Sequence, residues 1–246
     1  QRDARRARMA AESGLDLMRE VLPDVQLPNK TASTAHVLEA LADGLIGAIE
    51  GFELVDGFRL GWGARSPGIF DPEIAGGGVL SDAGVHWIDR LRFILGDATV
   101  TTYADDRLEG VEVNCEGECF LESASLGRVP GNFTFSWTDD LGSILSVDGE
   151  DGTLVLRGNI PDAIILRKEY GPRTYDLVIK SEAEPQAHDA FHDQLTAFHA
   201  LITESSRASG SLAGPEDGLQ AMRFIEDAYE MRRSLVQPWI HTGALA

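Results

Sequence analysis

Hydrophobic and polar residues follow two different periods along the chain, and the change of period separates expected helices from expected strands. Between residues 98 and 180 the period is two, and short turns such as 148–152 interrupt the alternation. Strands joined by short turns pair antiparallel, because parallel pairs need long crossovers. Residues 24–34 are rich in turn-forming types. Helical spacing extends over residues 5–21, 36–45, 81–95, 184–203 and 215–235.

This order of elements predicts an α+β fold: an open, mostly antiparallel sheet with helices grouped mainly on one face. The chain has 246 residues, 43% of them hydrophobic, which is enough for a sizeable core. It contains 40 acidic against 21 basic residues, so its formal charge is −19. Such a surface repels phosphate and anionic lipid, and no apolar run is long enough to span a bilayer. We therefore expect a cytoplasmic protein that binds neither nucleic acid nor a membrane.

The two cysteines, Cys115 and Cys119, lie in an alternating run over residues 111–121. Four residues of strand separate their backbones by roughly 13 Å, which is too far for a disulfide. No second Cys/His pair with zinc-like spacing is present. We expect two core thiols in a reducing compartment. The polar residues of the same run are expected on a solvated strand face: Glu112, Asn114, Glu116 and Glu118.

The most informative segment joins the glycines 76–78 to the helix expected over 81–95. Glycines permit close backbone approach, and Ser81 or Asp82 is expected to cap the helix. At about 100° per residue, Asp82, His86 and Asp89 share one face of the helix, opposite its apolar positions. A carboxylate one turn from an imidazole can orient it for proton transfer. The spacing alone, however, favours a simpler interpretation, in which Asp82 caps the helix and His86 is a half-buried structural histidine.

Residues 75–89, followed by Leu95-Gly96, resemble the signature helix in the C-terminal domain of the glucose-fructose oxidoreductase/inositol dehydrogenase/rhizopine-catabolism family. Residues 41–50, 148–156 and 213–233 also resemble parts of that domain. The resemblance implies an NAD(P)-dependent oxidoreductase acting on the CH–OH group of a sugar, inositol or related polyol. It implies that Asp82 and His86 lie in the active site beside a lysine of a Glu-Lys-Pro motif, with His86 transferring a proton.

The sequence departs from this family at the nucleotide-binding end. It has no Gly-x-Gly-x-x-Gly after a strand and no Glu-Lys-Pro, and its three lysines are Lys30, Lys168 and Lys180. We therefore expect residues 1–28 to be a remnant of the nucleotide-binding domain and residues 29–246 to form the substrate-binding and oligomerisation domain. NAD or NADP would be held by a domain absent from this chain. The alternative is a non-catalytic binding or assembly module derived from the family.

Three further residues are candidate substrate contacts. Arg65 and Trp62 offer a guanidinium fork and a stacking face to a polyol, although loop packing explains them equally well. His192 is expected to line the cleft, whereas a metal site would need His188, His192 and an outside ligand. A homo-oligomer is expected through the sheet. The alternating aromatic residues Phe133, Phe135 and Trp137 are expected in that interface or against the nucleotide domain.

Overall fold

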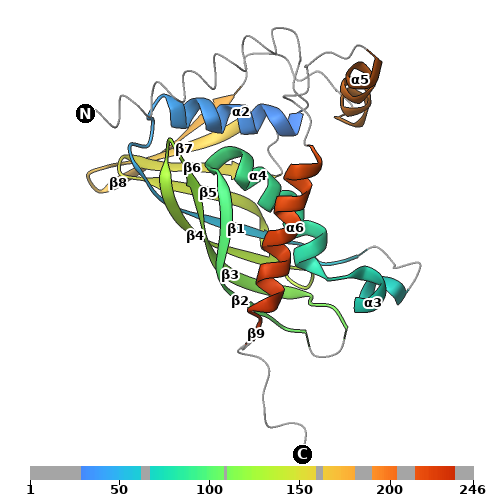
Figure 1. Ribbon diagram of the computed structural model, residues 1–246. Helices are drawn as coiled ribbons and strands as arrows, with labels where there is room; N and C mark the ends of the chain where they lie inside the picture. Colours follow the sequence, from blue (N-terminus) through green and yellow to red (C-terminus); the bar gives the residue numbers. More distant parts are fainter. Residues whose placement is uncertain are drawn as a thin grey trace, which may run out of the picture.

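The computed structural model describes residues 29–61, 67–107, 110–158, 163–180, 190–203 and 214–235. Within these ranges the chain forms one large sheet with helices α2, α4 and α6 across one face (Figure 1). This is the α+β architecture that the sequence predicts. The expected helix over 5–21 lies outside the described residues, as do Trp62 and Arg65.

The helical elements are short, and most of them lie before the meander of strands or after it. They are α2 (Asn29–Ala42), a 3-10 turn η1 (Pro67–Phe70), α3 (Pro72–Ala75), a π-helical turn η2 (Leu80–Gly84), α4 (Val85–Leu95), α5 (Ala190–Thr203) and α6 (Pro215–Glu230). No helix in the described part of the chain is long and apolar enough to cross a membrane.

The sheet has nine strands in the order β8-β7-β6-β5-β1-β4-β3-β2-β9. Their bounds are β1 (Ile49–Gly57), β2 (Asp97–Asp105), β3 (Asn114–Ser123), β4 (Gly127–Ser136), β5 (Gly142–Gly149), β6 (Gly152–Arg157), β7 (Ala163–Tyr170), β8 (Arg173–Lys180) and β9 (Arg233–Ser234). Pairing is antiparallel except between β1 and β4 and between β2 and the short β9.

Strand β1 occupies the centre of the sheet, between β4 and β5. Phe52 of β1 is aligned with Gly131 of β4, and a Cβ atom at Gly131 would lie 2.4 Å from the Phe52 ring. Gly131 is therefore required for the parallel pair to close over a large side chain. This arrangement divides the antiparallel meander into a β2-β3-β4 half and a β5-β6-β7-β8 half.

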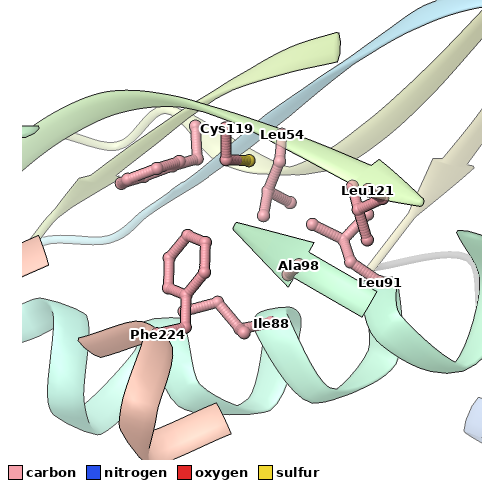
Figure 2. Close-up of a pocket in the computed structure, with 8 residues that line it drawn as sticks. Leu54, Ile88, Leu91, Ala98, Cys119, Leu121 and Phe224 are labelled. Atoms are coloured by element: carbon pink, nitrogen blue, oxygen red, sulfur yellow. The ribbon is translucent and has the colours of Figure 1, made fainter. Parts of the chain in front are cut away.

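The core is a single apolar layer between the helices and one face of the sheet. Helix α4 contributes Ile88 and Leu91, and α6 contributes Phe224, whose ring centroid lies 5.8 Å from that of Phe133. Figure 2 shows the gap at this junction, which measures about 10 Å³ and is lined by apolar side chains. A gap of this size without polar partners belongs to core packing and offers no ligand site.

The expectation that Phe133, Phe135 and Trp137 need a partner to cover them is wrong. All three are at most 3% exposed within this single chain, and helical segments contact the first two. Phe133 contacts α6, and a Cβ at Gly84 would lie 3.3 Å from the Phe135 ring. The opposite face of β3 carries the exposed Glu116 and Glu118 as expected, so it is compatible with water.

Three local expectations also need correction. Helix α2 begins at Asn29, inside the expected turn, because asparagine favours helix starts as well as turns. Helix α6 ends at Glu230, after which the chain enters β9. Glu112 and Asn114 are buried, whereas a solvated face was expected. The two cysteines are free and buried, which confirms the expected core thiols.

A buried ion pair attaches the end of the described chain to the sheet. Asp105 on β2 is fully buried, and its Oδ1 atom accepts hydrogen bonds from Arg232 Nε and from the backbone N–H of Arg107. Arg232 also donates to the carbonyl of Arg107. The backbone N–H of Leu235 donates to the Asp105 carbonyl at 2.7 Å, so β9 is held by side chain and backbone together.

We predict that Arg232→Ala lowers the free energy of unfolding by about 3–5 kcal/mol, because it leaves the Asp105 carboxylate buried without its counter-charge. Urea denaturation followed by circular dichroism measures the loss. The control is Arg167→Ala, which removes an exposed pair with Asp176 and changes stability little. Equal losses for the two variants would contradict the importance of burial.

Candidate functional site

The site begins at the glycines that lead from α3 into η2. Gly76 has a φ of +76° and ends α3, its N–H donating to the carbonyl of Pro72. A Cβ atom at Gly77 would lie 2.2 Å from the Tyr229 hydroxyl oxygen, and one at Gly78 would lie 1.8 Å from the Glu112 carbonyl oxygen. The expected close approach of the glycine backbone to a neighbouring segment is confirmed. The neighbours are the segment before β3 and helix α6.

The cap of the helical segment differs from the expectation. The turn begins at Val79 and Leu80, which places Ser81 and Asp82 inside it. Ser81 Oγ donates to the Gly78 carbonyl at 3.0 Å, and Asp82 makes no capping bond. The first N–H groups are instead bound by Glu112, whose Oε1 accepts from Gly78 at 3.0 Å and Leu80 at 3.2 Å.

Asp82 and His86 are both exposed, Asp82 on η2 and His86 in the first turn of α4. Among the described residues, no hydrogen bond or ion pair joins their side chains. The π-helical turn is one reason, because its i→i+5 bonding departs from the α-helical spacing that places residues i and i+4 on one face. The structure therefore makes Asp82 neither a cap nor a direct partner of the imidazole, and it leaves His86 accessible.

Asp89 is the carboxylate whose pKa is influenced by His86. Its pKa is raised, first by partial burial and then by the negative charge of Asp217, while Arg92 and His86 act in the opposite direction. Arg92 donates to the Asp217 carbonyl and to Asp97 Oδ1, both at 3.1 Å. The polar face of α4 therefore meets the first turn of α6, and the carboxyl of Asp89, whose pKa is raised, interacts electrostatically with the exposed His86.

The structure does not describe the side chains of the other expected site residues. Trp62, Arg65 and His188 lie outside the described residues, and the His192 side chain, on α5, lies outside them too. Within the described ranges, no group of three His, Cys, Asp or Glu residues is arranged to hold a metal ion. A surface hollow of about 320 Å³ lies on the opposite face of the sheet, around Glu118, Arg128 and Asn132.

Sequence reasoning missed Glu112 and Tyr229. Glu112 belongs to an alternating run of polar residues, which is the ordinary sign of a solvated strand face. It precedes the first residue of β3 and turns inward toward the glycines, where it is completely buried. The three consecutive glycines are the only local signal, since they predict a close neighbour without identifying it.

Known proteins share this sequence pattern and fold. Residues 34–155 match the model of the GFO/IDH/MocA C-terminal domain. Levoglucosan dehydrogenase in complex with NADH and levoglucosan superposes with a TM-score of 0.62 at 16% identity, over 83% of this chain and 64% of that one. An aldose-aldose oxidoreductase from Caulobacter crescentus complexed with glycerol gives 0.62 at 19% identity, over 82% and 59%.

A third similar structure is an oxidoreductase from Erwinia carotovora atroseptica, with a TM-score of 0.62 at 17% identity, over 85% of this chain and 62% of that one. This chain therefore spans about three fifths of the length of each of the three. The fold defines the class: an α+β C-terminal domain built on an open sheet. Residues 34–155 belong to the GFO/IDH/MocA C-terminal domain family, as the segment with the glycines, Asp82 and His86 predicts.

We predict that Gly78→Ala destabilises the protein by at least about 1–3 kcal/mol, because the new methyl group would overlap the Glu112 backbone. Thermal unfolding measures the effect. Gly218→Ala is the matched control, since no atom lies within 4 Å of a Cβ there and alanine favours the α6 helix. A Gly78→Ala protein as stable as the control would show that the close approach is not a real constraint.

Proposed function

We propose that this chain is the substrate-binding half of an NAD(P)-dependent oxidoreductase acting on the CH–OH group of a sugar, inositol or related polyol. The observation that carries the proposal is the exposed His86, placed beside Asp82 and Asp89 at the end of a glycine turn that is tied to the sheet. Similar folds occur in proteins named as dehydrogenases or oxidoreductases of sugars, which supports the substrate class.

In this proposal His86 takes the proton from the substrate hydroxyl as the alcohol carbon is oxidised. An imidazole suits this role because it binds and releases protons near neutral pH. Asp82 contributes a nearby negative charge, and Asp89 lies within electrostatic reach of the imidazole. Both Asp82 and His86 are exposed, so a hydrophilic substrate can reach each of them.

The glycine turn does not fit the phosphates of a dinucleotide. A phosphate-binding turn needs free N–H groups at a helix start. Here the N–H groups of Gly78, Val79 and Leu80 are bound by the carboxylate and carbonyl of Glu112. A buried carboxylate at that position also repels phosphate. The proposal accordingly assigns the nicotinamide to a separate domain.

We predict that the 246-residue chain alone does not bind NADH with a Kd in the micromolar range, because Glu112 uses the N–H groups that a pyrophosphate would need. Titration followed by nicotinamide fluorescence measures binding. Saturable micromolar binding would overturn the assignment of the cofactor to another domain. Lysozyme at the same concentration serves as the control for nonspecific fluorescence change.

We predict that, in an enzyme joining this chain to its nucleotide domain, His86→Ala lowers kcat about 10²–10⁴-fold and leaves cofactor affinity unchanged. Steady-state kinetics with a panel of sugars and inositols measures the effect. His36→Ala, on α2, is the control for loss of a histidine elsewhere and is expected to keep kcat. Wild-type turnover in His86→Ala would remove the catalytic role and favour the alternative, a non-catalytic binding or assembly module.

A further inference from the structure

We propose that Glu112, held by Tyr229, is a positioning residue that fixes the segment carrying Asp82 and His86 against the sheet. This inference rests on the proposed function for its catalytic consequence. The structural link between Glu112, the glycine turn and Tyr229 does not depend on the proposed function. It can be measured in the 246-residue chain alone.

Glu112 acts as a helix cap supplied from a distant part of the sequence. The first N–H groups of a helix have no partner within the helix, and a nearby side-chain oxygen normally accepts from them. Here one carboxylate oxygen, Oε1, accepts from the N–H groups of Gly78 and Leu80. The Glu112 carbonyl accepts from Val79 at 3.0 Å. Three consecutive N–H groups are therefore bound by one residue, which determines both the place and the direction of the turn.

The link continues directly to the site. The Gly78 carbonyl accepts hydrogen bonds from the N–H of Asp82 and from Ser81 Oγ, both at 3.0 Å. Gly78 is therefore bound to Glu112 through its N–H and to Asp82 through its carbonyl. The segment continues without a break into α4, whose first turn carries His86. A displacement of the Glu112 carboxylate would move the turn and both candidate catalytic side chains with it.

Tyr229 holds the other side of the same carboxylate oxygen. Its hydroxyl donates to Glu112 Oε1 at 2.7 Å from the last turn of α6. The pKa of Tyr229 is raised, mainly by burial and next by the Glu112 charge, so the hydroxyl stays protonated and remains a donor. The Arg107 guanidinium lies over the Tyr229 ring at 5.6 Å. Helix α6 and the glycine turn that leads to Asp82 and His86 are thus hydrogen-bonded to the same buried oxygen atom.

Burial makes this contact strong. Glu112 is completely buried, and Oε2 has no hydrogen-bond partner among the described residues. The three hydrogen bonds that the carboxylate accepts therefore all go to Oε1, two of them from backbone N–H groups at the start of the helical segment. Removing the side chain would leave two backbone N–H groups and one phenol buried without their acceptor, so neither the turn nor the end of α6 would keep its place.

Hydrogen exchange on the 246-residue chain tests the structural link. In Glu112→Ala we expect the amides of Gly78 and Leu80 to exchange at least about tenfold faster, while those of β6 and β7 do not change. Glu112→Gln keeps an oxygen acceptor and should restore most of the protection. Tyr229→Phe, which removes one donor and keeps the fold, should show a smaller increase confined to the same segment. Wild-type protection in both Glu112→Ala and Tyr229→Phe would overturn the inference.

Kinetics on the enzyme used for His86→Ala test the positioning role. We expect Glu112→Ala to lower kcat about tenfold or more with little change in KM, and Glu112→Gln to recover most of it. Leu145→Ala, in the core on β5, is the control for general destabilisation and is expected to keep kcat. An equal kcat loss in Leu145→Ala would show that general destabilisation explains the Glu112→Ala loss, and it would contradict the positioning role. If His86→Ala is fully active while the exchange result holds, the proposed function fails and the structural link stands.

Discussion

A single buried carboxylate oxygen organises the region where this protein is proposed to act. Glu112 Oε1 accepts hydrogen bonds from two backbone N–H groups and one phenol, which belong to the glycine turn and to helix α6. Burying a carboxylate is costly unless donors surround it. Once Glu112 lies in the interior, the glycines must approach it without side chains, and Tyr229 must point toward it. The location of Asp82 and His86 follows from this constraint.

At the adjacent edge of the sheet, a second acidic side chain likewise accepts several hydrogen bonds from neighbouring segments. Asp106 accepts from the backbone N–H groups of Val113 and Asn114 and from the Asn114 amide. The Asn114 oxygen then accepts from Ser136 at 2.6 Å and Thr138 at 2.8 Å. Together with the bond from Arg232 to Asp105 Oδ1, these hydrogen bonds tie the neighbouring ends of β2, β3 and β4 to the segments beside them. Polar side chains, together with the apolar layer, therefore determine the shape of this edge.

The candidate site illustrates how much chemistry a sequence pattern can identify. Glycines 76–78, Asp82 and His86 are adjacent in the chain, so their grouping needs no tertiary information, and the family resemblance follows from it. The accessibility of His86 is different, because it depends on which face of α4 packs against the sheet. The loss of a direct Asp82 to His86 contact depends on the π-helical turn, which the α-helical periodicity of the sequence does not reveal.

The sequence by itself determined the α+β class, the antiparallel meander, the buried thiols and the segment that carries the candidate site, because periodicity, turn residues and local spacing are properties of neighbouring residues. Only the tertiary structure decided that β1 enters the centre of the sheet, that α6 covers Phe133, and that Glu112 turns inward. A glutamate in an alternating run has the same local pattern whether it faces water or three hydrogen-bond donors. The donors come from residues 34 and 32 positions earlier and 117 positions later, so only folding brings them together.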